Sequence, residues 1–207
     1  MKKALLSVFT LLFLGIVHVY AQNVFYGTGV LVGQSYSAPK TLQGFPGNIT
    51  QGSQSFFMVG VGVPVDAQLI RVADEMSIGF HIEPAFAYTL SFLNDFDDNI
   101  YVFQSPLMAQ FNYGNFSSND ASSDFGFGLG LGLMAQFQAS TDFSSSVVDE
   151  GKSTLFLPTV QGSFRFWGPG NKLYAAKLSY SFGSEDFGGI SNNRSTAFLS
   201  LSRYLNY

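Results

Sequence analysis

Residues 125–133 read FGFGLGLGL, so large apolar residues occupy the odd positions and glycines the even ones. Side chains of a β-strand point alternately to its two faces, and this segment therefore predicts a strand with one apolar face and one almost bare face. A helix is excluded because the four glycines would cost about 4 kcal/mol of helix propensity relative to alanine. The pattern also suits a half-buried strand of a water-soluble sandwich, so the choice between the two environments depends on the rest of the chain.

The chain begins MKKALLSVFTLLFLGIVHVYAQN, with a basic start at Lys2 and Lys3 and an apolar stretch over residues 4–17. This layout is typical of a secretory signal peptide, and the apolar stretch is short for a membrane-spanning helix. We therefore expect residues 1–21 to be a cleaved signal peptide and residues 22–207 to form one domain. The chain has no cysteine, which excludes both a lipid anchor on a cysteine and disulfide bonds.

The composition is unusual for a water-soluble domain. Aromatic residues make up 16% of the chain and charged residues 12%, against a usual charged share of about 25%. After the signal peptide no segment approaches the ~20 apolar residues of a spanning helix, which excludes a helical membrane protein. The net charge of −4, more negative once the two lysines of the signal peptide are removed, argues against binding to nucleic acid.

Alternation with period two continues along the mature chain and predicts eight strands, each with an apolar face and a face of glycine and polar residues. They span residues 24–33, 54–65, 76–90, 99–113, 125–138, 154–167, 172–182 and 196–207. If the apolar faces were buried as in a soluble sheet, the remaining faces would carry too few charges for a surface in water. A barrel whose apolar face meets lipid and whose polar face lines a narrow interior accounts for all these features.

Aromatic residues lie near the ends of the predicted strands. Phe125 and Phe127 precede the leucines of the fifth strand and Phe137 follows them, as in the aromatic girdles of a membrane barrel. The connections alternate between longer outer loops and inner turns. The expected outer loops are 34–53, 91–99, 139–153 and 183–195, and the expected inner turns are 66–75, 114–123 and 168–171.

These features resemble the small eight-stranded outer-membrane barrels of the OmpA and OmpX type, within the wider bacterial outer-membrane barrel-domain family. The C-terminal Tyr207, with Leu199, Leu201 and Leu205 on the same face, is similar to the signal that the barrel-assembly machinery recognises in that group. The resemblance implies an all-β, eight-stranded antiparallel up-and-down transmembrane β-barrel of a Gram-negative cell envelope, monomeric and in contact with outer-membrane lipid. Arg203 interrupts the alternation and either extends to the lipid headgroups or marks a bulge.

His81 is the one histidine outside the signal peptide, and Glu83 follows on the same face. One interpretation is a lipid A-modifying hydrolase in which His81 is the base, Glu83 orients it and Ser91 attacks. The other is an interior cluster of paired charges, which is favoured because the sequence has no serine-containing catalytic motif. We therefore expect no catalytic residue but a lumenal polar cluster that comprises His81, Glu83, Gln104, Gln110, Gln161, Arg165 and Lys177.

Eight strands enclose an interior just wide enough for side chains, so no open aqueous channel is expected in this porin-like wall. Glycines of the inner face leave room that long side chains such as Met108 fill or that a small ligand occupies, and filling is favoured. The acidic segment 92–99, FLNDFDDN, lacks the ligand spacing of a calcium loop. The GFGLGLG run lacks the lysine and helix start of a phosphate site. No metal or cofactor is therefore expected.

The expected function is a non-enzymatic structural or interaction role in envelope integrity, adhesion or secretion, exerted by the outer loops on an extracellular or envelope protein. A barrel that binds or transports a small ligand is the first alternative, and the hydrolase based on His81 is the second.

Overall fold

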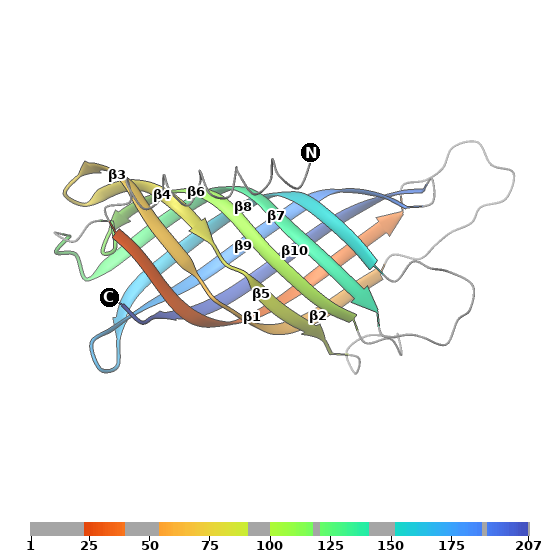
Figure 1. Cartoon of the computed structure of the whole chain (residues 1–207), viewed down its shortest axis with the longest axis horizontal. Helices are drawn as coiled ribbons and strands as arrows, with labels where there is room; N and C mark the ends of the chain where they lie inside the picture. The colour runs from red at the N-terminus through yellow and green to blue at the C-terminus, as the bar shows by residue number, and fades with distance from the viewer. Residues whose placement is uncertain are drawn as a thin grey trace, which may run out of the picture.

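The computed structural model describes residues 23–39, 54–90, 100–117, 121–140, 152–187 and 190–206 of the 207-residue chain. All the regular secondary structure in these ranges is β-strand (Figure 1). No helix long and apolar enough to cross a membrane occurs among the described residues. The strands are β1 (Asn23–Pro39), β2 (Gln54–Gly62), β3 (Val65–Ala73), β4 (Met76–Ile82), β5 (Ala85–Thr89), β6 (Ile100–Gly114), β7 (Phe125–Ser140), β8 (Lys152–Gly168), β9 (Lys172–Phe187) and β10 (Ile190–Tyr204).

The strands form one antiparallel sheet that closes on itself, because β1 pairs with β10 on one side and with β2 and β3 on the other (Figure 1). We call each strand position around the barrel a stave. β2 and β3 form a single stave that is interrupted at Val63 and Pro64, and β4 and β5 form another that is interrupted at Glu83 and Pro84. The ten strands therefore make eight staves, and the predicted eight-stranded up-and-down barrel is confirmed.

The two interruptions lie side by side in the wall. Proline has no backbone N–H to donate, so each proline removes one hydrogen bond from a ladder. Gly27 N donates to Pro64 O at 3.0 Å, and Val63 N donates to Pro84 O at 3.0 Å. Three neighbouring staves thus remain hydrogen-bonded across the break, and the alternation of inward and outward side chains continues through it.

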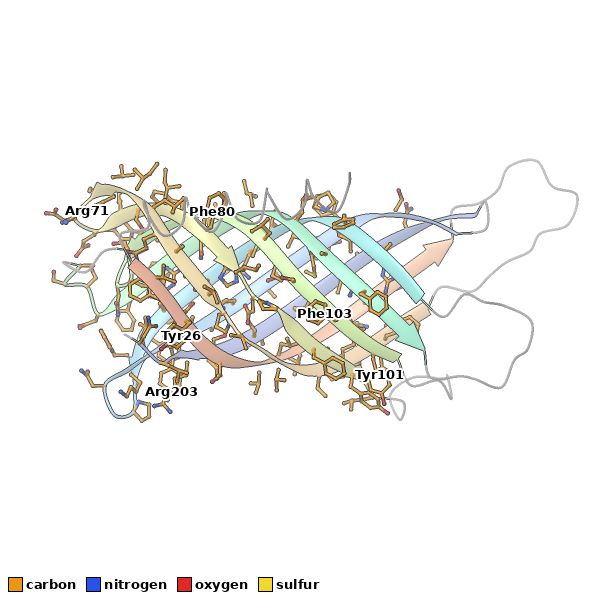
Figure 2. All side chains as sticks on the ribbon, viewed as in Figure 1. Tyr26, Arg71, Phe80, Tyr101, Phe103 and Arg203 are labelled. Atoms are coloured by element: carbon orange, nitrogen blue, oxygen red, sulfur yellow. The ribbon has the colours of Figure 1, made fainter. Side chains whose placement is uncertain are left out.

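The apolar face of the wall points outward. Along β7, Leu129, Leu131 and Leu133 are 60%, 59% and 52% exposed, and the glycines between them face the interior. Tyr26, Tyr101 and Phe103 project outward in the same way (Figure 2). The inward positions are mainly polar or small. This is the inverse of a soluble sandwich and is the arrangement that a lipid environment requires.

The two ends of the barrel differ (Figure 1). The turn end holds the short turns at 74–75 and 169–171, the start of β1 and the end of β10. The loop end holds the connections that follow β1, β5, β7 and β9. Outward-facing aromatic residues lie near both ends, with Tyr26, Tyr113 and Phe125 at the turn end and Tyr36, Tyr101, Phe137 and Phe182 at the loop end.

The predicted inner turn at 66–75 is wrong in extent. β3 continues to Ala73, and the turn consists of residues 74–75. Asp66 is buried inside the barrel, while Ile70 and Val72 face outward. Register shifts between β3 and β4 after Gln68 and after Arg71 disturb the alternation, and this is why the segment looks like a polar turn in the sequence.

The predicted outer loop at 183–195 is also wrong in extent, because β9 reaches Phe187 and pairs there with Ile190 at the start of β10. The hairpin extends beyond the apolar part of the wall, where both faces of a strand can be polar and alternation is lost. The described strands likewise reach into the predicted loops at 34–53 and 139–153, as far as Pro39 and Ser140.

Arg203 lies on the outer face at the end of β10 (Figure 2). The pairing of β10 with β1 and β9 continues through this position without a shift, so the interpretation of Arg203 as a bulge is wrong. Leu199, Leu201 and Leu205 are exposed on the same outer face. Tyr207 and the predicted signal peptide at 1–21 lie outside the described residues, and their roles stay predictions.

Candidate functional site

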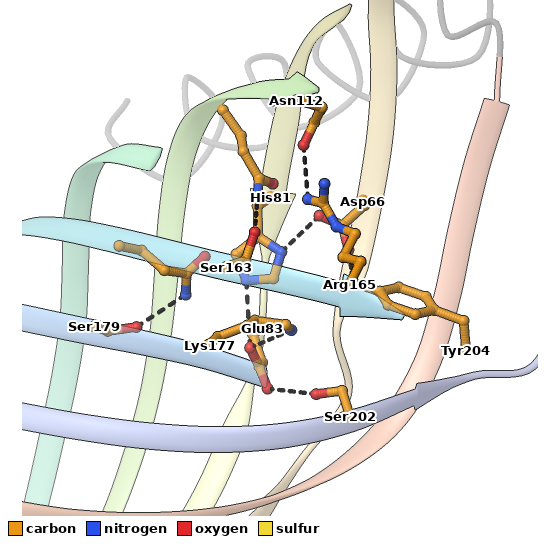
Figure 3. A network of polar contacts seen from close by, with 12 residues as sticks. Asp66, His81, Glu83, Asn112, Ser163, Arg165, Lys177, Ser179, Ser202 and Tyr204 are labelled. Carbon is orange, nitrogen blue, oxygen red and sulfur yellow. Dashed lines mark hydrogen bonds and ion pairs between the residues drawn. The ribbon is translucent and has the colours of Figure 1, made fainter. Parts of the chain in front are cut away.

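A network of charged and polar side chains crosses the interior of the barrel (Figure 3). Each member occupies an inward position of its stave, and side chains from different staves meet in the interior because the barrel is narrow. The six central side chains, all buried, are Asp66 of β3, His81 of β4, Glu83 between β4 and β5, Arg165 of β8, Lys177 of β9 and Tyr204 of β10.

Glu83 connects one side of the barrel with the other. Its Oε2 lies 2.8 Å from Lys177 Nζ and 3.3 Å from His81 Nε2. Ser202 Oγ donates to Oε1 at 3.5 Å. Glu83 lies next to Pro84 in the interruption between β4 and β5. The same two-residue segment therefore interrupts the strand ladder and supplies the central carboxylate of the network.

Asp66 occupies a matching position on the next stave. His81 Nδ1 lies 2.9 Å from Asp66 Oδ1, and the Tyr204 hydroxyl donates to Asp66 Oδ2. His81 therefore lies between two carboxylates, with one ring nitrogen facing each (Figure 3).

Arg165 extends the network toward β6. Its Nη2 donates to Asn112 Oδ1 at 2.7 Å, and the guanidinium lies over the Phe116 ring, 4.5 Å from the centroid. The amide of Gln110 satisfies its neighbours when its nitrogen donates to Asp66 Oδ1 at 3.0 Å and its oxygen accepts from Arg165 Nη2 at 2.7 Å. In that orientation one amide joins Asp66 to Arg165.

The charges of the network compensate one another. Asp66 and Glu83 supply two carboxylates, and Lys177 and Arg165 supply two permanent cations, with His81 between the carboxylates. Buried charges are tolerated where they are paired and hydrogen-bonded, and removal of one partner leaves the other uncompensated. We call the six central side chains of this network the plug.

Apolar side chains close the interior on both sides of the network. One cluster, which we call the turn-side layer, consists of Phe25, Phe116, Leu173, Ala175 and Tyr204. The other, the loop-side layer, consists of Leu31, Met58, Ala85, Ala87, Val102, Met134 and Phe198. A cavity of about 20 Å³ between the network and the loop-side layer is lined by Glu83, Gln104 and Gln161 among others, and it has room for about one water molecule.

A solved structure shares this architecture. No protein-family profile and no curated protein sequence matches the chain. Neisserial surface protein A matches over 90% of this chain and 100% of its own, with a TM-score of 0.53 and 12% identity. OprG of Pseudomonas aeruginosa matches over 89% of this chain and 95% of its own, with a TM-score of 0.48 and 12% identity. AlkL matches over 91% of this chain and 92% of its own, with a TM-score of 0.48 and 13% identity.

The chain has the fold of a small outer-membrane β-barrel. In this barrel all seven residues of the sequence-predicted lumenal cluster are buried in the interior. His81, Glu83, Lys177, Arg165 and Gln110 lie together in the network. Gln104 and Gln161 instead line the small cavity, where Gln161 Nε2 donates to Ser179 Oγ at 2.9 Å.

Three members of the network, Asp66, Tyr204 and Asn112, are not predicted from the sequence. Asp66 falls in the predicted inner turn at 66–75, and neither Tyr204 nor Asn112 is among the predicted residues of the lumenal cluster. The signal for Asp66 was its position next to Val65 at the apparent end of an alternating segment. Ser91, the nucleophile of the hydrolase interpretation, lies outside the described residues. In the described part of the barrel no group of three or more metal-ligating residues is arranged to hold a metal ion.

Proposed function

We propose that the protein is an integral outer-membrane β-barrel that conducts no solute and acts as a structural or interaction protein through its loop end. The observation that carries this proposal is the filled interior. A charge-compensated network lies between two apolar layers, and a pore would need a continuous wet path through all three. The exposed apolar belt and the two sets of aromatic residues support a position in a membrane.

The hydrolase alternative is disfavoured by the surroundings of His81. A serine hydrolase needs the imidazole to accept a proton from a serine hydroxyl while a carboxylate holds the other nitrogen. Both nitrogens of His81 face carboxylates, at 2.9 Å and 3.3 Å, and no serine of the described residues hydrogen-bonds the ring. We therefore propose that His81 is a structural member of the plug.

Solute flux into proteoliposomes tests the sealed interior. Vesicles that contain the purified, heat-modifiable full chain should take up small sugars and ions no faster than empty vesicles. A variant in which Arg165 and Lys177 are both replaced by alanine removes the two long cations of the plug and serves as a control that is expected to leak. Flux through the unaltered protein would contradict the proposal.

The role of the loop end is tested by shortening it. Residues 141–151 and, separately, 40–53 are replaced by short Gly-Ser linkers in the producing cell. Because the wall is complete without them, each variant should keep the gel shift of the assembled barrel but show the envelope defect of a strain that lacks the whole protein. Full complementation by both variants would place the function elsewhere.

A further inference from the structure

A groove of about 640 Å³ crosses the outer wall where the two staves are interrupted. Its floor is formed by the backbone around Gly29 of β1 and its register partner Gly62 of β2, both inward positions of the wall, and by the small outward side chain of Thr28. Apolar side chains form its sides, among them Val61, Val63, Phe86, Phe103 and Leu201. The groove is therefore an apolar hollow on the face that meets lipid, and Leu129 and Leu131 of β7 are not among the residues that line it.

The turn end of the groove carries a cation. Arg203 lines it beside Thr28, its register partner on β1, and Tyr174, its register partner on β9. Arg203 is exposed and has no hydrogen bond or ion pair with any residue in the described ranges. Arg71, also exposed at the turn end, differs because it is paired with Asp74 at 2.7 Å. An arginine on the outer wall of a membrane barrel is costly unless it reaches the headgroup level and finds an anion there.

We propose that this groove binds one phospholipid, with an acyl chain along Val61, Val63 and Leu201 and with the phosphate accepting hydrogen bonds from the Arg203 guanidinium. Guanidinium and phosphate form bidentate, charge-assisted pairs. The apolar lining and Arg203 belong to one groove, and Tyr174, which lines it beside Arg203, is amphipathic, as side chains at the headgroup level are. The inference rests on the proposed position in a membrane, but it adds a specific lipid site to it.

The test uses the full chain in maltoside micelles, which contain no phosphate, with phosphatidylglycerol that carries a diazirine on one acyl chain. After illumination, labelled peptides are mapped by mass spectrometry. Labelling of the groove at Val61, Val63 and Phe86 should exceed labelling at Leu129 and Leu131 several-fold. These two leucines are about as exposed as Val61 but lie outside the groove, so they report non-specific contact with the probe.

Two variants and one second probe complete the test. Arg203→Gln should lower groove labelling about fivefold, the factor for one basic residue at an anionic lipid, and Arg203→Lys should retain most of it. Val61→Trp should fill the groove and abolish the excess. A diacylglycerol with the same diazirine, which lacks the phosphate, should label both faces alike.

Equal labelling of both faces by the phospholipid, or no effect of Arg203→Gln, would overturn the lipid site. Preferential labelling of the groove by the diacylglycerol would also overturn it, since the phosphate would then have no part. A heat-dependent gel shift of every variant shows that the barrel is assembled. Absence of that shift in the unaltered protein would instead count against the proposed function.

Discussion

Lys177 Nζ lies 2.8 Å from Glu83 Oε2 inside the barrel, although 94 positions separate the two residues in the chain. The pair joins β9 to the interrupted stave of β4 and β5. Both side chains are nearly inaccessible to solvent, at 2% and 7%, so neither charge can be hydrated if the other is removed. The stability of the plug should therefore depend on this pair more than on any exposed ion pair.

Lys177→Met should lower the free energy of unfolding by about 3–5 kcal/mol, because it leaves the Glu83 carboxylate buried without its cation. Urea titration of the folded barrel in micelles, followed by gel mobility, measures the change. Lys172→Met, near the turn at the end of the barrel, is the matched control and should stay within about 0.5 kcal/mol. Adding Glu83→Gln to Lys177→Met should recover part of the loss, and a single variant as stable as the unaltered protein would contradict this role.

Tyr204→Phe should cost about 1–2 kcal/mol, because the buried Asp66 carboxylate loses the hydroxyl that donates to Oδ2 while the ring still packs in the turn-side layer. Tyr26→Phe removes an outward-facing hydroxyl at the same end of the barrel and should have no measurable effect. The same urea titration compares the two variants. Equal effects would mean that the Tyr204 hydroxyl is not part of the network.

Two glycines of β7 face the same neighbour and should respond differently to alanine. A Cβ at Gly132 would lie 2.7 Å from the backbone Cα of Met108, whereas a Cβ at Gly130 would lie 3.4 Å from the flexible Met108 Sδ. Gly132→Ala should therefore destabilise the barrel by about 1–3 kcal/mol, and Gly130→Ala should be close to neutral. Stabilities in the reverse order would show that the packing around Met108 is different.

Leu131→Arg should cost about 2–4 kcal/mol, because a charge in the middle of a lipid-facing strand has no partner. Leu131→Phe keeps the position apolar and should be tolerated. The fraction of assembled protein in the membrane, read from the gel shift, compares the two. Normal assembly of the arginine variant would be incompatible with a lipid-facing Leu131.

The sequence predicts the wall of this barrel well, because alternation is a direct consequence of strand geometry. The parity of Leu129 and Leu131 against Gly130 and Gly132 needs no tertiary information. The prediction of the wall is less accurate between Asp66 and Ala73, because register shifts between β3 and β4 hide the alternation there.

The pairing inside the barrel was less accessible from the sequence. His81, Glu83 and Lys177 are recognisable as inward residues, but which side chains meet depends on the stagger of eight staves. Glu83 pairs with Lys177 rather than with Arg165, a choice that the sequence left open. Asp66 belongs to the network because residues 65–73 form the strand β3 rather than a turn, and Tyr204 because it occupies a buried, inward position of β10.

Cysteine labelling in a lipid bilayer tests the central claim, an apolar wall around a sealed interior, most directly. The chain has no native cysteine, so single cysteines can be placed at Leu129, Leu131 and Leu133 and at the inward positions Gly130 and Met108. The three outward cysteines should react with a membrane-confined maleimide. The two inward ones should react neither with it nor with a water-soluble maleimide until the protein is unfolded. Reaction of the inward cysteines with the water-soluble reagent would show an open interior, and reversed parity with the membrane-confined reagent would show that the wall faces the other way.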